Sequence, residues 1–306
     1  MLNRKDILNK DGLTEEQFLA QYNPGDYERP SVTVDMLLFT ITDKIVEDVR
    51  KLDEKELKIL LIKRKDHPYI GQWALPGGFV NKYESLDEAA YRELREETNI
   101  DNVYMEQLGT FGDRDDKGQP RDPRMWVISA AYMALVPNKN LNPIAGDDAE
   151  DVAWFTVKKG EEILTDDGVI VNLVLENKEK NAIINYKIRE KHSYRGVTKV
   201  KKPYYELDES SSDSIAFDHY KMIDMALDRL RNKIEYTSVA FNLVNEYFTM
   251  AEIQSIFELI LNKKFHRMEF TRKVRDMVIE TDMVNNEKGY RPAKYYKYNK
   301  DWTHEF

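Results

Sequence analysis

The chain has no cysteine among its 306 residues. The absence of thiols excludes disulfide bonds, thiol nucleophiles and cysteine metal sites. No apolar run approaches the roughly 20 residues that are needed to span a bilayer, so we expect no membrane segment. The start, MLNRKDILNKDGL, lacks the apolar core of an export signal. Together these absences lead us to expect a cytoplasmic protein.

Charge is distributed unevenly along the chain. The net charge is −9, yet between Lys263 and Lys300 eleven Lys and Arg residues stand against five Asp and Glu residues, a local balance of +6. Residues 1–262 therefore carry −13. An acidic body followed by a basic segment predicts two modules with different partners. We place the boundary after a Ser-rich linker, which gives modules over residues 1–212 and 213–306.

Hydrophobic patterning predicts strands and helices in the first module. Stretches rich in β-branched and apolar residues predict strands at Ser31–Ile41, Leu57–Lys63, Trp126–Val136 and Val152–Phe155. A further helix is expected over 158–170. The polar, Lys-rich stretch 172–205 is interpreted as a long hairpin or an insertion.

Capping boxes predict where two helices of this module begin. Thr14 with Gln17 predicts a short N-terminal helix that buries Phe18 and Leu19. A second capping box, Ser85 with Glu88, predicts a helix over 86–98. The second helix is the important one, because it carries the acidic residues considered next.

Three carboxylates share one face of the helix over 86–98. Glu93, Glu96 and Glu97 are spaced i, i+3, i+4, so they are neighbours on the helix surface. Three like charges repel one another, and a divalent cation would reverse that cost. Carboxylate oxygens are the ligands that Mg²⁺ accepts, usually together with substrate phosphates. Arg92 is placed to pair with one of the carboxylates and fix its rotamer.

Two glycines precede this helix. Gly77 and Gly78 allow a tight backbone turn that brings amide groups close to an anion, beside a helix N-terminus that favours negative charge. A glycine turn, a helix start and an acidic stripe therefore predict a site for a metal-bound diphosphate. The chemistry that such a site supports is attack of an activated water on phosphorus, with a carboxylate taking the proton.

The spacing of these residues resembles the Nudix pattern. It runs from Gly78 through Glu84 to Arg92-Glu93-Leu94-Arg95-Glu96-Glu97-Thr98-Asn99-Ile100. The resemblance implies an α/β/α sandwich and hydrolysis of a nucleoside diphosphate linked to another moiety, with Mg²⁺ or Mn²⁺. It implies Glu93, Glu96 and Glu97 as metal ligands or base. It implies Glu84 and Arg92 as supporting residues.

The chain departs from the Nudix pattern at one position. Asn99 stands where the pattern has a glycine that ends the helix in the left-handed conformation. Asn is the residue that tolerates this conformation best after glycine, so we expect the helix end to be preserved.

Two further groups could complete the pocket. Arg121 and Arg124 lead into a predicted strand, where they either grip phosphate bidentately or form an ordinary charged turn. Trp73 and Phe79 either stack on a base or pack in the core, and packing is the favoured interpretation.

The second module has the element order of a winged helix. Helices are predicted at Tyr236–Tyr247, at Ala251–Asn262 after a capping box, and at Arg267–Val278, followed by a two-stranded wing around Gly289. Residues expected to face duplex DNA are Arg267, Thr271, Arg272, Lys273, Arg275, Lys288, Arg291 and Lys294. Cations on a recognition helix and a wing suit phosphate contacts. A structural or dimerisation role is the alternative.

The whole architecture resembles Nudix-related transcriptional regulators and ADP-ribose pyrophosphatase-like proteins. The residues that carry this resemblance in the second module include Phe217-Asp218-His219, Phe270-Thr271-Arg272-Lys273 and Arg291-Pro292-Ala293-Lys294. The resemblance implies a homodimer that takes ADP-ribose, a related sugar nucleotide or a sugar metabolite as ligand. Two compatible hypotheses follow, a working metal-dependent hydrolase and a ligand-sensing regulator. The complete acidic pattern disfavours a third, an inert scaffold.

Overall fold

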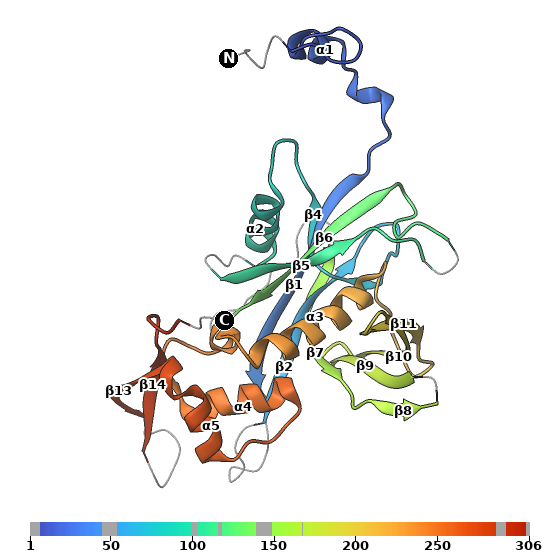
Figure 1. The fold of residues 1–306 in the computed structure, drawn as a ribbon. Coiled ribbons are helices and arrows are strands. Elements are labelled where there is room, and N and C mark those ends of the chain that lie inside the picture. The colour runs from blue at the N-terminus through green and yellow to red at the C-terminus, as the bar shows by residue number, and fades with distance from the viewer. Residues whose placement is uncertain are drawn as a thin grey trace.

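A large mixed sheet forms the centre of the molecule (Figure 1). The computed structural model describes residues 7–44, 54–98, 103–115, 118–138, 149–166, 168–285 and 292–303, without the side chains of residues 97 and 98. The sheet strands are β1 (Ser31–Asp43), β2 (Lys55–Arg64), β3 (Trp73–Ala74), β4 (Gly77–Phe79), β5 (Tyr104–Phe111), β6 (Val127–Leu135), β7 (Ala149–Lys159), β8 (Ile163–Thr165), β9 (Gly168–Asn177), β10 (Ala182–Arg195) and β11 (Thr198–Leu207). Their main order is β11-β10-β9-β7-β2-β1-β6-β5. The four strands predicted from patterning are confirmed as β1, β2, β6 and β7.

Helices cover both faces of the sheet. Along β1, side chains alternate between the faces: Val34, Met36 and Leu38 join the core under α2 (Leu86–Thr98). Leu37, Phe39 and Ile41 join the core under α3 (His219–Ile234). The predicted α/β/α sandwich is therefore confirmed. The capping box that begins α2 is also present, with Ser85 and Glu88 exchanging hydrogen bonds of 2.8 and 3.2 Å.

The helix predicted over 158–170 is wrong. β7 continues to Lys159, β8 follows, and β9 starts at Gly168. Residues of β9 alternate between buried and less buried positions, a period of two that suits a strand rather than a helix. The hairpin expected over 172–205 is confirmed, and it adds β9, β10 and β11 to one end of the sheet.

After α3, the described residues of the C-terminal module form a three-stranded sheet and two further helices. The elements are η3 (Val239–Leu243), β12 (Phe248–Thr249), α4 (Met250–Leu261), α5 (Arg267–Val274), η4 (Arg275–Met277), β13 (Val278–Asn285) and β14 (Ala293–Tyr298). The helix predicted at Tyr236–Tyr247 is wrong, since only the short 3-10 helix η3 forms there. Its residues Val239, Ala240, Phe241 and Leu243 are all buried, so this segment has no polar face of its own.

The two modules share one hydrophobic core. Buried residues of α3, α4 and α5 belong to the same cluster as the inner face of the sheet. Arg231 of α3 donates to the carbonyl of Lys159 in β7 at 2.8 Å and to that of Ile260 in α4 at 3.2 Å. α3 thus bonds to both the sheet and α4, and α4 itself also packs against β2.

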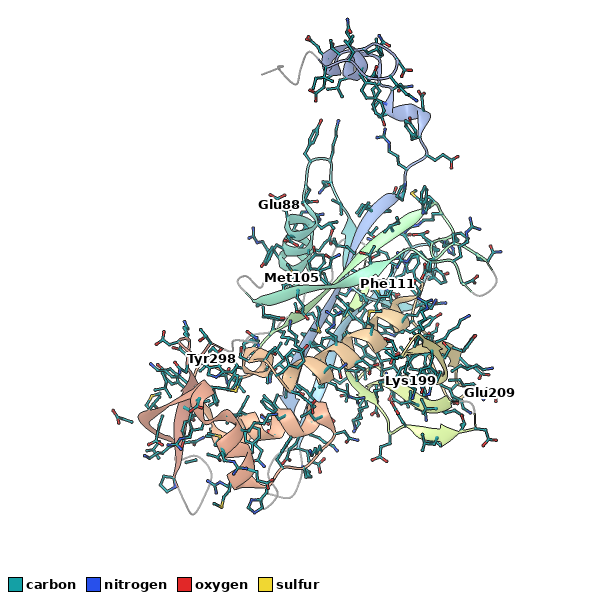
Figure 2. All side chains as sticks on the ribbon, viewed as in Figure 1. Glu88, Met105, Phe111, Lys199, Glu209 and Tyr298 are labelled. Carbon is teal, nitrogen blue, oxygen red and sulfur yellow. The ribbon has the colours of Figure 1, made fainter. Side chains whose placement is uncertain are left out.

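An N-terminal arm extends away from this body. It holds α1 (Glu15–Gln21) and η2 (Pro24–Asp26), and no other described segment lies beside it (Figures 1 and 2). The capping box of Thr14 and Gln17 is confirmed. The predicted burial of Phe18 and Leu19 is wrong, because their exposed fractions are 44% and 62%. No helix in the described ranges is long and apolar enough to cross a membrane.

Candidate functional site

The glycine turn and α2 meet at a close contact. Gly78 pairs with Val34 across β1 and β4. A Cβ atom on Gly78 would lie 2.2 Å from Oε1 of Glu93, and one on Gly77 would lie 2.2 Å from the carbonyl oxygen of Val34. Any larger residue would force these groups apart. The glycines therefore let the backbone approach the first carboxylate of the acidic stripe, while their role toward an anion stays a prediction.

Arg92 connects the acidic groups of the site. Its Nε lies 2.8 Å from Oε1 of Glu84, and its Nη1 lies 2.6 Å from Oε1 of Glu93 and 3.3 Å from Oε2 of Glu96. Its Nη2 also donates to the carbonyl of Phe79 at 3.1 Å. Such charge-assisted bonds fix rotamers, so the predicted pairing of Arg92 with a carboxylate of the stripe is present in the structure, and the bond to Glu84 is an additional one.

The carboxyl groups around Arg92 differ in the direction in which their pKa is shifted. Hydrogen bonds from Arg92 and from the backbone of Asn81 lower the pKa of Glu84 to about 2. Burial raises the pKa of Glu93, and Arg92 only partly offsets this effect. A buried carboxylate with a raised pKa is one that gains from a further positive charge.

The donor set suits a divalent cation. Glu93 and Glu96 line the same cavity, and oxygen donors are what hard divalent cations prefer. The side chain of Glu97 lies outside the described residues, although its backbone continues α2. Within the described side chains, no group of three His, Cys, Asp or Glu residues is close enough to hold a metal ion. Glu97 as a third ligand stays what the resemblance to the Nudix pattern implies.

The glycine turn, Arg92, Glu93 and Glu96 line a cavity of about 560 Å³. The predicted site residues on its lining are Gly77, Gly78, Arg92, Glu93, Glu96, Arg121 and Arg124. The lining also includes Asp35 from β1, and Phe217 and His219, which flank Asp218 where α3 begins. The cavity therefore lies between the acidic helix and the start of the helix that contacts the winged module.

The two arginines expected to hold phosphate have carboxylate partners. Nη2 of Arg121 lies 2.7 Å from Oδ1 of Asp218 and 3.6 Å from Oδ2 of Asp35. Nη2 of Arg124 lies 2.7 Å from Oδ2 of Asp122. Arg121 is almost fully buried, whereas Arg124 is 40% exposed. Both remain within reach of the cavity that they line.

Hydrophobic patterning alone did not single out Asp35 and His219, which also line the cavity. Asp35 is buried in a strand, where it accepts a hydrogen bond from Ser129 and lies 3.5 Å from Nε2 of His219. His219 Nδ1 accepts the backbone N–H of Leu75 at 3.0 Å. Burial lowers the pKa of this imidazole. The available sequence signal was Phe217-Asp218-His219 itself, which stood out only in the comparison of whole architectures.

The two aromatic residues that were left open differ in position. Trp73 is buried and packs edge-on against Phe155, with ring centroids 4.7 Å apart. Phe79 is 43% exposed and lines the cavity, where the guanidinium of Arg124 lies 5.8 Å from its ring. Packing accounts for Trp73, and Phe79 is the aromatic face available to a ligand.

The second predicted site lies on α5 and the wing. Arg267, Arg272, Lys273 and Arg275 are exposed, and Phe270 and Val274 are buried on the opposite side. Thr271 is half-buried and donates to the carbonyl of Arg267 at 2.9 Å. On the wing, Lys294 pairs with Glu280. Lys288 and Arg291 lie outside the described residues. The cations of α5 and Arg275 of η4 are thus exposed, and their contact with DNA stays a prediction.

Comparisons with family models match both modules. Residues 48–171 match the model described as NUDIX domain. Residues 240–298 match the model described as NrtR DNA-binding winged helix domain.

Curated relatives cover the chain to different extents. One is the "ADPR responsive transcriptional repressor NtrR" of Acinetobacter baylyi, which is 30% identical over 93% of this chain and 88% of the relative. Another is the "ADP-ribose pyrophosphatase" of Methanocaldococcus jannaschii, which is 44% identical over 33% of this chain and 56% of the relative. The first match spans both modules and the second only part of the sandwich.

Solved structures agree with this picture. A MutT/nudix family protein from Enterococcus faecalis superposes with a TM-score of 0.65, at 28% identity over 94% of both chains. NrtR from Shewanella oneidensis superposes with a TM-score of 0.58, at 27% identity over 88% of this chain and 94% of that one. The same protein complexed with a 27mer DNA gives a TM-score of 0.57 at 28% identity, over 88% of this chain and 93% of that one.

Proposed function

The chain belongs to the family of the ADPR responsive repressor of Acinetobacter baylyi, and we propose its function from that premise. Its Nudix domain would hydrolyse ADP-ribose or a closely related nucleoside diphosphate. Its DNA-binding winged helix domain would bind operator DNA under control of that ligand. The observation that carries this proposal is the cavity between the acidic face of α2 and the first residues of α3. A diphosphate bound there would contact both the hydrolytic residues and the helix that adjoins the winged module.

In the proposed reaction, α2 supplies the base and the metal ligands. Glu93, Glu96 and Glu97 would hold a divalent cation, with Mg²⁺ or Mn²⁺ as the ions that carboxylates and phosphates suit. When bound, such a cation lowers the pKa of water and neutralises charge on the phosphates. Arg92 supports the site by fixing the carboxylate of Glu93, and Glu84 fixes Arg92 in turn.

The remaining residues would orient the substrate. Gly77 and Gly78 keep the backbone close to Glu93 and leave room for a diphosphate. Arg121 and Arg124 would donate to phosphate oxygens from the other side of the cavity. Attack of water on one phosphorus would then release AMP and ribose 5-phosphate from ADP-ribose.

Hydrolysis can be tested with the full-length chain. We expect Mg²⁺-dependent release of AMP from ADP-ribose, reduced about 10²–10⁴-fold in Glu93→Gln because a positioned carboxylate is lost. Glu97→Gln should have a similar effect. Glu88→Gln is the matched control, since Gln also completes a capping box. Absence of turnover on a panel of nucleoside diphosphate derivatives would leave regulation as the only function.

The regulatory half of the proposal concerns α5 and the wing. We propose that Arg267, Thr271, Arg272, Lys273 and Arg275 contact duplex DNA, joined by Lys288, Arg291 and Lys294 from the wing. The exposure of the cations on α5 supports this role. Binding to DNA from upstream of the coding sequence should weaken as salt rises, and ADP-ribose should change its affinity. Salt-independent binding would contradict a phosphate-contacting surface.

A homodimer formed through the N-terminal arm is part of the proposal. α1 is seven residues long and buries none of them, and helices this short are marginal in water without a packing partner. Exposed Phe18, Leu19 and Tyr22 form the apolar surface that a second copy would cover. Phe18→Ser with Leu19→Ser should lower the mass measured by sedimentation to that of a monomer. Leu164→Ser, an exposed position on β8, should not. We place the protein in the cytoplasm, where nucleotide and DNA are both present.

A further inference from the structure

Asp218 occupies a position with two possible hydrogen-bonding roles. It is the N-cap residue of α3, where an Asp side chain ordinarily accepts a backbone N–H of the first turn. In this structure the carboxylate makes no such cap bond. It accepts instead from Arg121, at 2.7 Å from Nη2 and 3.1 Å from Nε. One carboxylate is thus withheld from the helix that it begins.

The residues beside Asp218 are held by the cavity wall as well. Phe217 has φ of +55°, a left-handed conformation that is costly for a bulky residue. Its ring lies edge-on to Tyr69 at 4.7 Å and under the guanidinium of Arg64 at 5.1 Å. His219 accepts the N–H of Leu75. The start of α3 is therefore kept in a strained geometry by contacts with residues around the cavity.

Arg121 faces competing anions. The pair that it forms with Asp218 is nearly buried, with side-chain exposures of 6% and 12%, and Arg121 also lines the cavity. A diphosphate entering the cavity presents oxygens that accept the same bidentate, charge-assisted bonds from guanidinium as the carboxylate does, and it carries more negative charge. Asp35 lies 3.6 Å from the same nitrogen of Arg121, so the guanidinium has a second carboxylate beside it.

We infer that Arg121 is exchanged between Asp218 and the bound diphosphate, so that ligand binding frees Asp218 to cap α3 and releases the strained start of that helix. This inference rests on the proposed function, and it assigns the response to one ion pair. Asp218 acts as a positioning residue that competes with the ligand for Arg121.

The C-terminal half of α3 connects the site of the Arg121 exchange to the winged module. Arg231 of α3 holds carbonyls of both β7 and α4, and buried residues of α3 share a core with α4 and α5. A shift at the N-terminal turn of α3 would therefore be passed to packed elements rather than absorbed by a linker. Packed interfaces of this kind change between discrete arrangements.

The test uses the full-length chain with Asp218→Asn and Asp218→Ser. Both replacements are good N-cap residues, so the beginning of α3 is kept while the charge that holds Arg121 is removed. Calorimetric titration with ADP-ribose, and separately with inorganic pyrophosphate, is done without divalent metal so that no turnover occurs. We expect the Kd for both probes to fall about tenfold, because the bond between Asp218 and Arg121 no longer competes with the ligand.

A gain in affinity is a result that a merely structural defect would not give. Asp228→Asn is the control, because it removes an equal charge from α3 at the pair with Lys159. Its Kd should match the wild type. DNA binding of the Asp218 variants, measured by fluorescence anisotropy with and without ADP-ribose, should lose most of the ligand dependence that the wild type has.

Failures of the inference and of the proposed function can be told apart. If the wild type binds neither ADP-ribose nor pyrophosphate, the proposed function is wrong and the inference falls with it. If the wild type binds and the Asp218 variants bind with the same or weaker affinity, only the exchange of Arg121 is overturned. Retention of the full ligand effect on DNA in both Asp218 variants would overturn it as well.

Discussion

Charged side chains are arranged in opposite ways in the cavity and on α5. In the cavity, Arg92 and Arg121 are largely buried and each is bonded to carboxylates of this chain. On the winged module, Arg272 of α5 and Arg275 of η4 are exposed to solvent. Burying an unpaired charge is expensive, whereas an exposed cation keeps its hydration. The cavity is therefore assembled before a ligand arrives, and the α5 surface acquires its partners only on binding.

This difference predicts where substitutions act. Changes in the cavity should alter chemistry through sub-ångström displacements of groups that are already in place. Changes on α5 should alter affinity in proportion to charge and salt, with little effect on the fold. The three predictions below test the contrast, starting with the largest expected effect.

Gly78→Ala tests whether the cavity depends on close packing. The added Cβ would lie 2.2 Å from Oε1 of Glu93, so the carboxylate must move. We expect kcat for ADP-ribose hydrolysis to fall about a hundredfold, because misplacement by about 1 Å has effects of that size. Gly160→Ala is the control, since its Cβ would meet Asn172 at an ordinary 3.6 Å. A loss within twofold for Gly78→Ala would mean that the contact is not needed.

The pH dependence of stability tests the buried side of the comparison. Burial keeps the pKa of His219 below its ordinary value of 6.5. The unfolded chain then takes up a proton that the folded chain does not, so stability falls as pH drops below about 6.5. From this residue we expect a loss of up to about 1.4 kcal/mol per pH unit, measured by urea unfolding.

Two variants separate this effect from general acid sensitivity. His219→Asn keeps an acceptor for the N–H of Leu75 and should show a shallower decline below pH 6.5. His266→Asn, at an exposed position, should follow the wild type. Parallel curves for the wild type and His219→Asn would show that His219 does not titrate with folding.

Two cations of the winged module test the other member of the comparison, the exposed surface of α5 and the wing. Arg272→Ala should weaken DNA binding several-fold and reduce the salt slope by about one, since a phosphate contact is lost. Lys294→Ala should have a smaller effect, because Lys294 pairs with Glu280 and must leave that partner first. Salt titrations by fluorescence anisotropy compare the two. Equal slopes for both variants would remove the distinction between paired and exposed cations.

Local sequence determined the acidic half of the cavity. The offsets from Gly78 to Glu96 fix which side chains share a helix face, and α2 begins at its capping box as expected. The other half joins Asp35 to Asp218, which are far apart in sequence. No periodicity reports that β1 and the start of α3 meet, because this contact depends on how the sheet is ordered.

The two wrong predictions about the fold, the helix over 158–170 and the burial of Phe18 and Leu19, have related causes. The polar and charged residues over 158–170 suit a helix surface as well as an exposed strand, and only pairing with β9 settles the choice. Phe18 and Leu19 carry an apolar pattern that predicts burial, yet their own chain provides no cover within its described ranges. Sequence shows that a surface requires a partner, and it does not show which molecule supplies it.

The edge of the large sheet has a consequence for how copies of this chain associate. β11 ends the sheet and carries Lys199, Lys201, Lys202 and Pro203. The lysines repel the same positive edge of a second copy, and proline lacks the N–H that a new strand would need. Growth into fibres by edge-to-edge strand addition is thereby disfavoured at β11. Strand addition at this edge is therefore not a route by which copies associate, and the proposed dimer contact lies elsewhere, on the arm.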